Sequence, residues 1–153
     1  MTNYHLIKSF NEFSIHELYA VLRLRNEVFI IEQNCPYLDL DGKDQESFHL
    51  LYYVKDQLAA YTRLLPAGLS YEEPSIGRVI TAPSFRGIGL GKLLMEASID
   101  GCYEKFGICG IRISAQYHLS KFYSSLGFAE VGQVYDEDGI PHIQMFRAPL
   151  GKH

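Results

Sequence analysis

Arg86-Gly87-Ile88-Gly89-Leu90-Gly91-Lys92 decides the fold of this chain, because it joins a strand pattern to a helix pattern. Before it, Ser75–Thr81 has the short apolar run of a buried strand. After it, Leu90–Phe106 carries apolar or small residues at spacings of three and four, which places them on one face of a helix. The unit is therefore a strand, a glycine-rich turn and a helix.

The glycines of this turn suit the binding of a phosphate group. Gly87, Gly89 and Gly91 have no Cβ, so the backbone can turn sharply and present successive N–H groups to a ligand. The first N–H groups of a helix have no internal partner, and the helix dipole attracts anions to that end. The alternative is a tight turn that binds nothing.

Two common nucleotide-binding motifs do not fit this turn. A dinucleotide fingerprint counted from Gly87 would need glycine at Lys92, and a P-loop would need Ser or Thr at Leu93. The pattern that remains is R-x-x-G-x-G, from Arg86 to Gly91. It resembles the acetyl-CoA pyrophosphate loop of the GNAT superfamily of N-acetyltransferases.

This resemblance implies a cofactor site for acetyl-CoA, as the acetyl donor. The loop amides would hold its pyrophosphate, and the edge of the preceding strand would pair with the pantetheine arm. The cofactor-binding residues implied in this way are Val79, Ile80 and Thr81 of the strand and Arg86, Gly87, Ile88, Gly89, Leu90 and Gly91 of the loop. A backbone N–H near Val79 is expected to hold the oxyanion of the reaction.

A second segment supports the same resemblance. Phe122-Tyr123-Ser124-Ser125-Leu126-Gly127-Phe128 resembles the F-Y-x-x-x-G-F segment that closes the GNAT cofactor site. The resemblance implies that Tyr123 is the general acid for the leaving thiolate, and a phenol, with a pKa of roughly 10, stays protonated at neutral pH. A core tyrosine with a backbone partner is the alternative. Gln116 stands where many members have asparagine, and its amide is expected to contact the cofactor.

A narrower resemblance, to the ElaA-type branch of this superfamily, covers nearly the whole chain. It rests on Leu24-Arg25-x-Glu27-Val28-Phe29-x-x-Glu32-Gln33-x-x-Pro36-Tyr37, on Asp41-Gly42-x-Asp44 and on Asp138-Gly139-Ile140-Pro141-His142. The implied fold class is α/β (α+β): a mixed, mostly antiparallel sheet with flanking helices. Its two central parallel strands splay apart to admit the pantetheine arm.

The patterns along the chain predict the same order of elements. Ser14-x-x-Glu17 is a capping box that opens a helix, which runs to near Ile31 or breaks into a second short helix. Its apolar side is expected to include Ile15, with Arg25 on a solvated face. The other expected elements are strands at Tyr4–Ile7, Ser47–Lys55, Leu58–Leu65, Ser75–Thr81, Gly110–Ala115, Phe128–Tyr135 and Ile140–Arg147, and helices at Leu90–Phe106 and Leu119–Leu126. The two strands flanking the longer helix should be parallel neighbours with a right-handed crossover.

An acidic loop, Leu38–Asp44, lacks the ligand order of a calcium-binding loop, so no metal site is predicted. Its acids, with Glu72 and Glu73, would suit a cationic acceptor such as a polyamine or a peptide amine. The more ordinary interpretation is a solvated acidic loop.

Length and composition narrow the class of protein. The chain has 153 residues, 47% apolar and 21% charged, which predicts a single domain over residues 1–153. Its net charge of −4, without a basic stripe, argues against nucleic acid as a partner. The sequence has no apolar run of membrane-spanning length and no signal-peptide pattern, and its three cysteines form no C-x-x-C pair. The expectation is a cytoplasmic protein with reduced thiols and no membrane partner.

The sequence thus predicts an acetyl-CoA-dependent N-acetyltransferase that transfers acetyl directly to an amine of a small molecule or peptide. Glu32 is the first candidate for the base that deprotonates the amine, with Asp44, His118 and His142 as the others. One alternative is a non-catalytic module that binds or senses acyl-CoA, and another is a structural protein with an empty loop. A homodimer through the hairpin at residues 128–147 is also compatible with the sequence.

Overall fold

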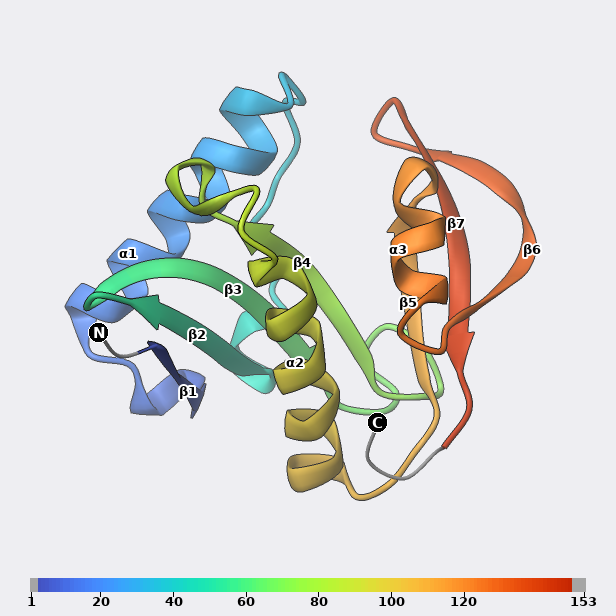
Figure 1. Cartoon of the computed structure of the whole chain (residues 1–153), viewed down its shortest axis with the longest axis horizontal. Helices are drawn as coiled ribbons and strands as arrows, with labels where there is room; N and C mark the ends of the chain where they lie inside the picture. Colours follow the sequence, from blue (N-terminus) through green and yellow to red (C-terminus); the bar gives the residue numbers. More distant parts are fainter. Residues whose placement is uncertain (1–2, 150–153) are drawn as a thin grey trace.

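Two antiparallel sheets form the frame of the molecule, as seen in a computed structural model that describes residues 3–149 (Figure 1). The first sheet has the strand order β1-β2-β3-β4 and the second the order β5-β7-β6. The strands are β1 (Asn3–Ser9), β2 (Phe48–Val54), β3 (Gln57–Leu65), β4 (Ser75–Thr81), β5 (Ile111–Gln116), β6 (Ala129–Glu137) and β7 (Ile140–Arg147). The helices are α1 (Ile15–Arg25), α2 (Leu90–Phe106) and α3 (Ser120–Ser124), and a π-helical segment, Asn26–Glu32, continues α1.

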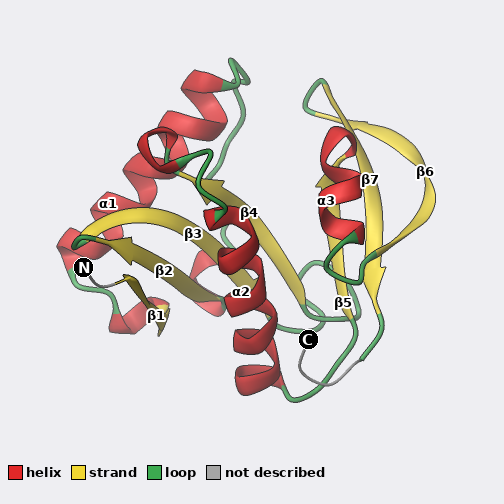
Figure 2. Ribbon diagram, viewed as in Figure 1, coloured by secondary structure: helices red, strands yellow, loops and turns green. Residues whose placement is uncertain are grey.

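Helices α1 and α2 cover opposite faces of the first sheet (Figure 2). The alternation of side chains along a strand explains this division, because successive residues point to opposite faces. In β2, Leu51 packs in the cluster that contains Val21 and Leu24 of α1, whereas Leu50 packs with Leu90 and Leu94 of α2. Both leucines of β2 are fully buried.

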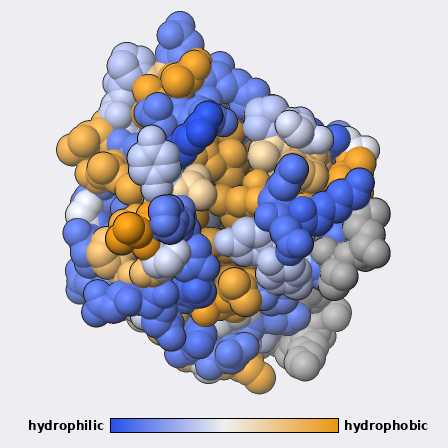
Figure 3. Space-filling view, turned by 90° about the vertical axis from the view of Figure 1, so that its left-hand side faces the viewer, coloured by the Kyte–Doolittle hydropathy of each residue, from blue (hydrophilic) through white to orange (hydrophobic). Residues whose placement is uncertain are grey.

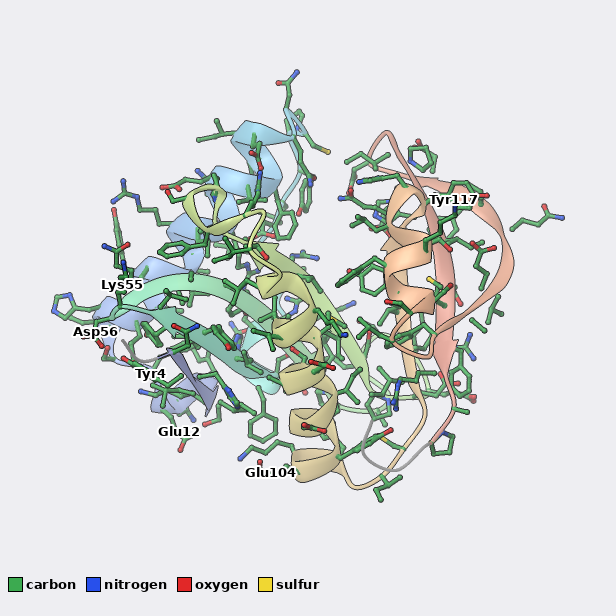
Figure 4. The ribbon with its side chains drawn as sticks, in the orientation of Figure 1. Tyr4, Glu12, Lys55, Asp56, Glu104 and Tyr117 are labelled. Carbon is green, nitrogen blue, oxygen red and sulfur yellow. The ribbon has the colours of Figure 1, made fainter. Side chains whose placement is uncertain are left out.

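The hairpin of β2 and β3 shows how local sequence sets a turn. Lys55 and Asp56 both have positive φ, 52° and 60°, which matches the twist that a two-residue hairpin turn needs. The hydroxyl of Tyr4 on β1 donates to Asp56 at 3.2 Å, beside the tip of this hairpin (Figure 4).

The two sheets diverge between β4 and β5, which run in the same direction (Figure 1). A backbone hydrogen bond from the N–H of Arg112 to the carbonyl of Pro74, 3.0 Å long, ties the starts of these strands together. Farther along they belong to separate sheets. The expected parallel neighbours are therefore adjacent only where they begin, and the expected splay is present.

A β-bulge in β4 gives the physical reason for the splay. Tyr61 of β3 faces Ile80, but Arg63 faces Gly77, so Arg78 and Val79 together oppose one residue of β3. A bulge bends its strand and leaves the extra residue outside the ladder. Arg78 has a φ of 51°, a left-handed conformation that is unusual for a residue with a side chain.

The first helix confirms its capping box and corrects two expectations. The Ser14 hydroxyl accepts from the N–H of Glu17 at 3.0 Å, and the Glu17 carboxylate accepts from the N–H of Ser14 at 2.9 Å. Ile15 is 79% exposed, because it lies six residues before the buried Val21 and so about 120° around the helix from it. Arg25 is 1% exposed, because it lies one turn after Val21 on the same inner face.

The other elements match their predicted positions to within a few residues. In the short helix α3 the α-helical part is Ser120–Ser124, and a 3-10 turn precedes it. The face that carries α1 shows hydrophobic side chains in separate patches among hydrophilic ones (Figure 3). Within residues 3–149, no helix combines the length and the hydropathy that crossing a bilayer requires.

Candidate functional site

The glycine-rich loop presents free backbone donors at the start of α2. Gly87 and Gly89 have φ values of 80° and 78°, and Gly89 is the residue that caps the helix. The N–H groups of Gly87, Ile88 and Gly89 donate to no other backbone group in residues 3–149. These three residues are exposed, so their donors and the helix dipole together favour an anion such as a pyrophosphate.

Arg86 connects this loop to two other segments. Its guanidinium donates to both carboxylate oxygens of Glu32, each at 2.7 Å, and its Nε donates to the carbonyl of Thr81 at 3.1 Å. The hydrogen bond from Arg86 lowers the pKa of Glu32, which is therefore held as a carboxylate. The loop is thus tied to the end of β4 and to the π-helical segment.

A cavity of about 430 Å³ occupies the divergence of the two sheets. Gly77, Arg78 and Val79 of the β4 bulge line one wall. The other wall is formed by the ends of β5 and β6, the start of β7 and α3, including the predicted site residues Gln116 and Tyr123. The side chain of Ile80 is instead buried under α1, so only its backbone is available to a ligand.

Tyr123 lies in this cavity with its hydroxyl free. The ring is held between Phe122 and Phe128, with centroids 5.2 and 6.1 Å away, and the residue is 6% exposed. The hydroxyl makes no hydrogen bond within residues 3–149 that would mark it as a structural core tyrosine. Burial raises the pKa of Tyr123 to about 12, so the phenol keeps its proton at neutral pH. A Cβ on Gly91 would lie 3.8 Å from Phe122, which shows how closely the loop packs against α3.

Comparison with known proteins agrees with this geometry. The model of the acetyltransferase (GNAT) domain family matches residues 20–148. The chain belongs to the GNAT family. The protein ElaA of Escherichia coli is 44% identical over 139 residues, which are 90% of this chain and 91% of that protein.

Two solved structures show the same fold over nearly all of the chain. The crystal structure of Escherichia coli ElaA superposes with a TM-score of 0.89 and covers 95% of this chain and 99% of that one. That of an acyl-CoA N-acyltransferase from Pseudomonas aeruginosa gives a TM-score of 0.91 at 40% identity, covering 96% of this chain and 100% of that one. The splayed GNAT fold and the ElaA resemblance that the sequence predicts are confirmed.

The four candidate bases of this GNAT domain lie in different environments. Glu32 is engaged by Arg86, and neither Glu32 nor the exposed His118 lines the cavity that contains Tyr123. Asp44 is 6% exposed and also does not line this cavity. His142 does line the cavity, and it is 7% exposed. Of these four residues, His142 is therefore the one that lines the same cavity as Tyr123.

The acidic loop is largely exposed, but its aspartates are not free to bind a cation, because they pair with arginines, of which Arg25 and Arg63 are buried. Asp44 accepts from Arg25 at 2.8 Å and from Arg63 at 3.0 Å. Burial alone would raise the pKa of Asp44, but the hydrogen bonds and charges of these two arginines outweigh it and lower the pKa. Asp41 likewise accepts two hydrogen bonds from Arg63, each at 2.8 Å.

The same network reaches the bulge of β4. Asp39 accepts from Arg25 at 2.8 Å and from Arg78 at 2.7 Å, and its carbonyl accepts from Arg78 at 3.0 Å. The sequence shows three closely spaced aspartates but gives no sign that arginines from α1, β3 and β4 meet them. The strained residue at the bulge is therefore held by its side chain.

Proposed function

We propose that this protein is an acetyl-CoA-dependent N-acetyltransferase that transfers the acetyl group directly to an amine. The observation that supports this most is the free hydroxyl of Tyr123 in the cavity that the β4 bulge and Gln116 also line. A loop with three free N–H groups lies at the adjacent helix end. Both parts are what an acyl-CoA-dependent acyl transfer needs: an anchor for the pyrophosphate and an acid for the thiolate.

In the proposed reaction the chain supplies two groups to the reacting thioester. A backbone N–H near Val79, at the bulge, holds the oxyanion when the neutral amine attacks the carbonyl carbon. As the carbon–sulfur bond breaks, Tyr123 donates its proton to the thiolate and recovers one from the nitrogen that has become an amide. Gln116, on the cavity wall, contacts the pantetheine arm.

The acceptor in this proposal is a small-molecule or peptide amine that meets the enzyme in the cytoplasm. Neither nucleic acid nor membrane takes part, and a homodimer through the β6–β7 hairpin is compatible with the reaction. A non-catalytic acyl-CoA-binding module is the second candidate, since it needs the same loop but has no use for the hydroxyl of Tyr123.

Two measurements test the proposal. Calorimetric titration with acetyl-CoA should show one-to-one binding, and release of the CoA thiol should follow on addition of amines from a panel of polyamines, amino acids and peptides. Propionyl- and butyryl-CoA in the same assay define the donor. Binding without thiol release from any amine would favour the non-catalytic module, and absence of binding would refute the function of the loop.

A further inference from the structure

His142 and Glu137 form a close pair in the cavity. The β6–β7 hairpin turns at Asp138-Gly139, which places Tyr135 directly opposite His142 and Glu137 on the diagonal from it. The Nε2 atom of His142 lies 3.3 Å from Oε2 of Glu137. Both residues line the cavity that contains Tyr123.

The other ring nitrogen of His142 defines where its protons are. Nδ1 lies 2.8 Å from the carbonyl oxygen of Ile140. A carbonyl oxygen only accepts, so Nδ1 carries a hydrogen and donates it. In the neutral ring, Nε2 then has a lone pair. This lone pair lies close to Oε2 of the Glu137 carboxylate, which is also a hydrogen-bond acceptor.

Two acceptors at this separation are stabilised by a proton between them. One proton on Nε2 of His142 would lie between the two acceptors and be donated to the carboxylate of Glu137. When that proton is absent, the pair offers two adjacent acceptors, which is the arrangement that an ammonium group binds with its N–H donors.

We propose that the pair of His142 and Glu137 binds the ammonium group of the acceptor and removes its proton. This inference rests on the proposed acetyl transfer. The ammonium gives one proton to Nε2 of His142 and becomes a neutral amine, whose lone pair attacks the thioester carbonyl. The carbon–sulfur bond breaks, Tyr123 protonates the sulfur, and the nitrogen returns a proton to Tyr123. The proton on the pair then leaves to water, so each turnover releases one proton, one amide and one CoA thiol.

Neighbouring groups hold Glu137 in place and leave it an exit to water. The hydroxyl of Ser114 donates to Oε1 of Glu137 at 3.2 Å, and Ser114 also contacts the hydroxyl of Tyr135. The ring of Tyr135 lies 6.2 Å from that of His142. Glu137 has a half-exposed side chain, whereas that of His142 is only 9% exposed, so the proton can pass from the buried ring through the carboxylate to solvent.

The charges on the facing wall are largely matched among themselves. Arg63 and Arg78 line that wall and bind Asp41, and Lys43, also on the wall, donates to Ser70 at 2.9 Å. Among the described residues that line the cavity, Glu137 and Asp138 are the carboxylates without an arginine partner. A cationic acceptor is therefore attracted to the wall that carries the pair.

The experiment compares His142→Gln and Glu137→Gln with the wild-type protein, using the amine that gives thiol release. For His142→Gln, kcat/KM at neutral pH should fall about 100-fold or more, the scale of general base catalysis. In the wild-type protein, kcat/KM should fall at low pH, where the pair of His142 and Glu137 is protonated. In His142→Gln, kcat/KM should instead rise continuously with pH. For Glu137→Gln, the KM for the amine should rise, because a neutral amide attracts the ammonium group less than a carboxylate does. Calorimetric affinity for acetyl-CoA should be unchanged in both.

The control variant is His16→Gln, which changes an exposed histidine of α1 outside this cavity and should alter neither the rate nor the profile. A wild-type pH profile in His142→Gln, or an unchanged KM for the amine in Glu137→Gln, would overturn the inference while leaving the acetyltransferase proposal intact. The NMR resonances of the His142 ring give a readout that needs no turnover. They should shift when the amine is added to the wild-type protein and shift less in Glu137→Gln. Ring resonances that do not respond to the amine would also overturn the inference, even if the variants turned over no amine.

Discussion

Replacing Tyr123 with phenylalanine should remove catalysis while leaving the fold and the cofactor affinity intact. The ring would keep its contacts with Phe122 and Phe128, and the lost hydroxyl has no hydrogen-bond partner in residues 3–149 that the change would leave unpaired. The free energy of unfolding should therefore change by less than about 0.5 kcal/mol. The rate should fall by about 10²–10⁴, the contribution of a positioned general acid, which corresponds to a barrier higher by about 3–5 kcal/mol.

The assay measures thiol release under saturating acetyl-CoA, together with calorimetric affinity and a urea melt. Tyr117→Phe is the matched control, because Tyr117 is 46% exposed on the turn before α3 and does not line the cavity (Figure 4). Since burial raises the pKa of Tyr123 to about 12, its ionisation should cause no loss of rate up to about pH 10. A Tyr123→Phe enzyme with wild-type kcat would refute the assignment. A variant with lost affinity for acetyl-CoA would show that the hydroxyl binds rather than protonates.

Three further outcomes are expected. Glu32→Gln should leave the shape of the pH–rate profile unchanged. It should also tighten acetyl-CoA binding by a few-fold at low salt, because Arg86 is then free for the pyrophosphate. If the fall in rate at low pH disappeared in this variant, Glu32 would be the base. Arg25→Met should lower the free energy of unfolding by about 3–5 kcal/mol in urea melts, because two carboxylates lose a buried partner, and a loss under 1 kcal/mol would show that the network is dispensable. The wild-type protein should lose stability below about pH 4, because Asp41 and Asp44 have lowered pKa values in the fold: they contribute stability above their unfolded pKa and lose it as the pH falls through the folded one. Thermal melts from pH 7 to pH 3 check this, and Asp44→Asn should flatten the decline.

Local chemistry explains which parts of the fold could be predicted from the sequence. The glycines at positions 87 and 89 adopt the left-handed conformation that only their backbone tolerates well, and Ser14 caps α1 as its spacing from Glu17 indicates. Tyr123 can be predicted to line the cavity because the residues around it, Phe122 to Phe128, follow the F-Y-x-x-x-G-F order. Each of these features depends on residues that are close together in the chain.

Features that depend on distant partners could not be predicted. Helical spacing places Arg25 on the inner face, but nothing in its own segment identifies Asp39 and Asp44 as the partners that make its burial tolerable. The pair of His142 and Glu137 is an intermediate case. The predicted strands end at Tyr135 and begin again at Ile140, which leaves four residues for the turn, whereas in the structure β6 continues to Glu137 and the turn is Asp138-Gly139. The extra pairing of Glu137 with Ile140 fixes the register that brings Glu137 close to His142.

The bulge of β4 connects the acidic loop to the backbone N–H near Val79 that is proposed to hold the oxyanion. Glycine would adopt the conformation of Arg78 without strain, whereas a residue with a side chain costs about 1–2 kcal/mol there. The hydrogen bonds from Arg78 to Asp39, each charge-assisted and worth about 1.5–3 kcal/mol, offset that cost. An arginine at this position therefore makes the bulge depend on the acidic loop. Asp39→Asn should then weaken the hold on Arg78 and shift the N–H near Val79. The rate should fall by a larger factor than the affinity for acetyl-CoA, because the glycine-rich loop that binds the pyrophosphate does not contact the network.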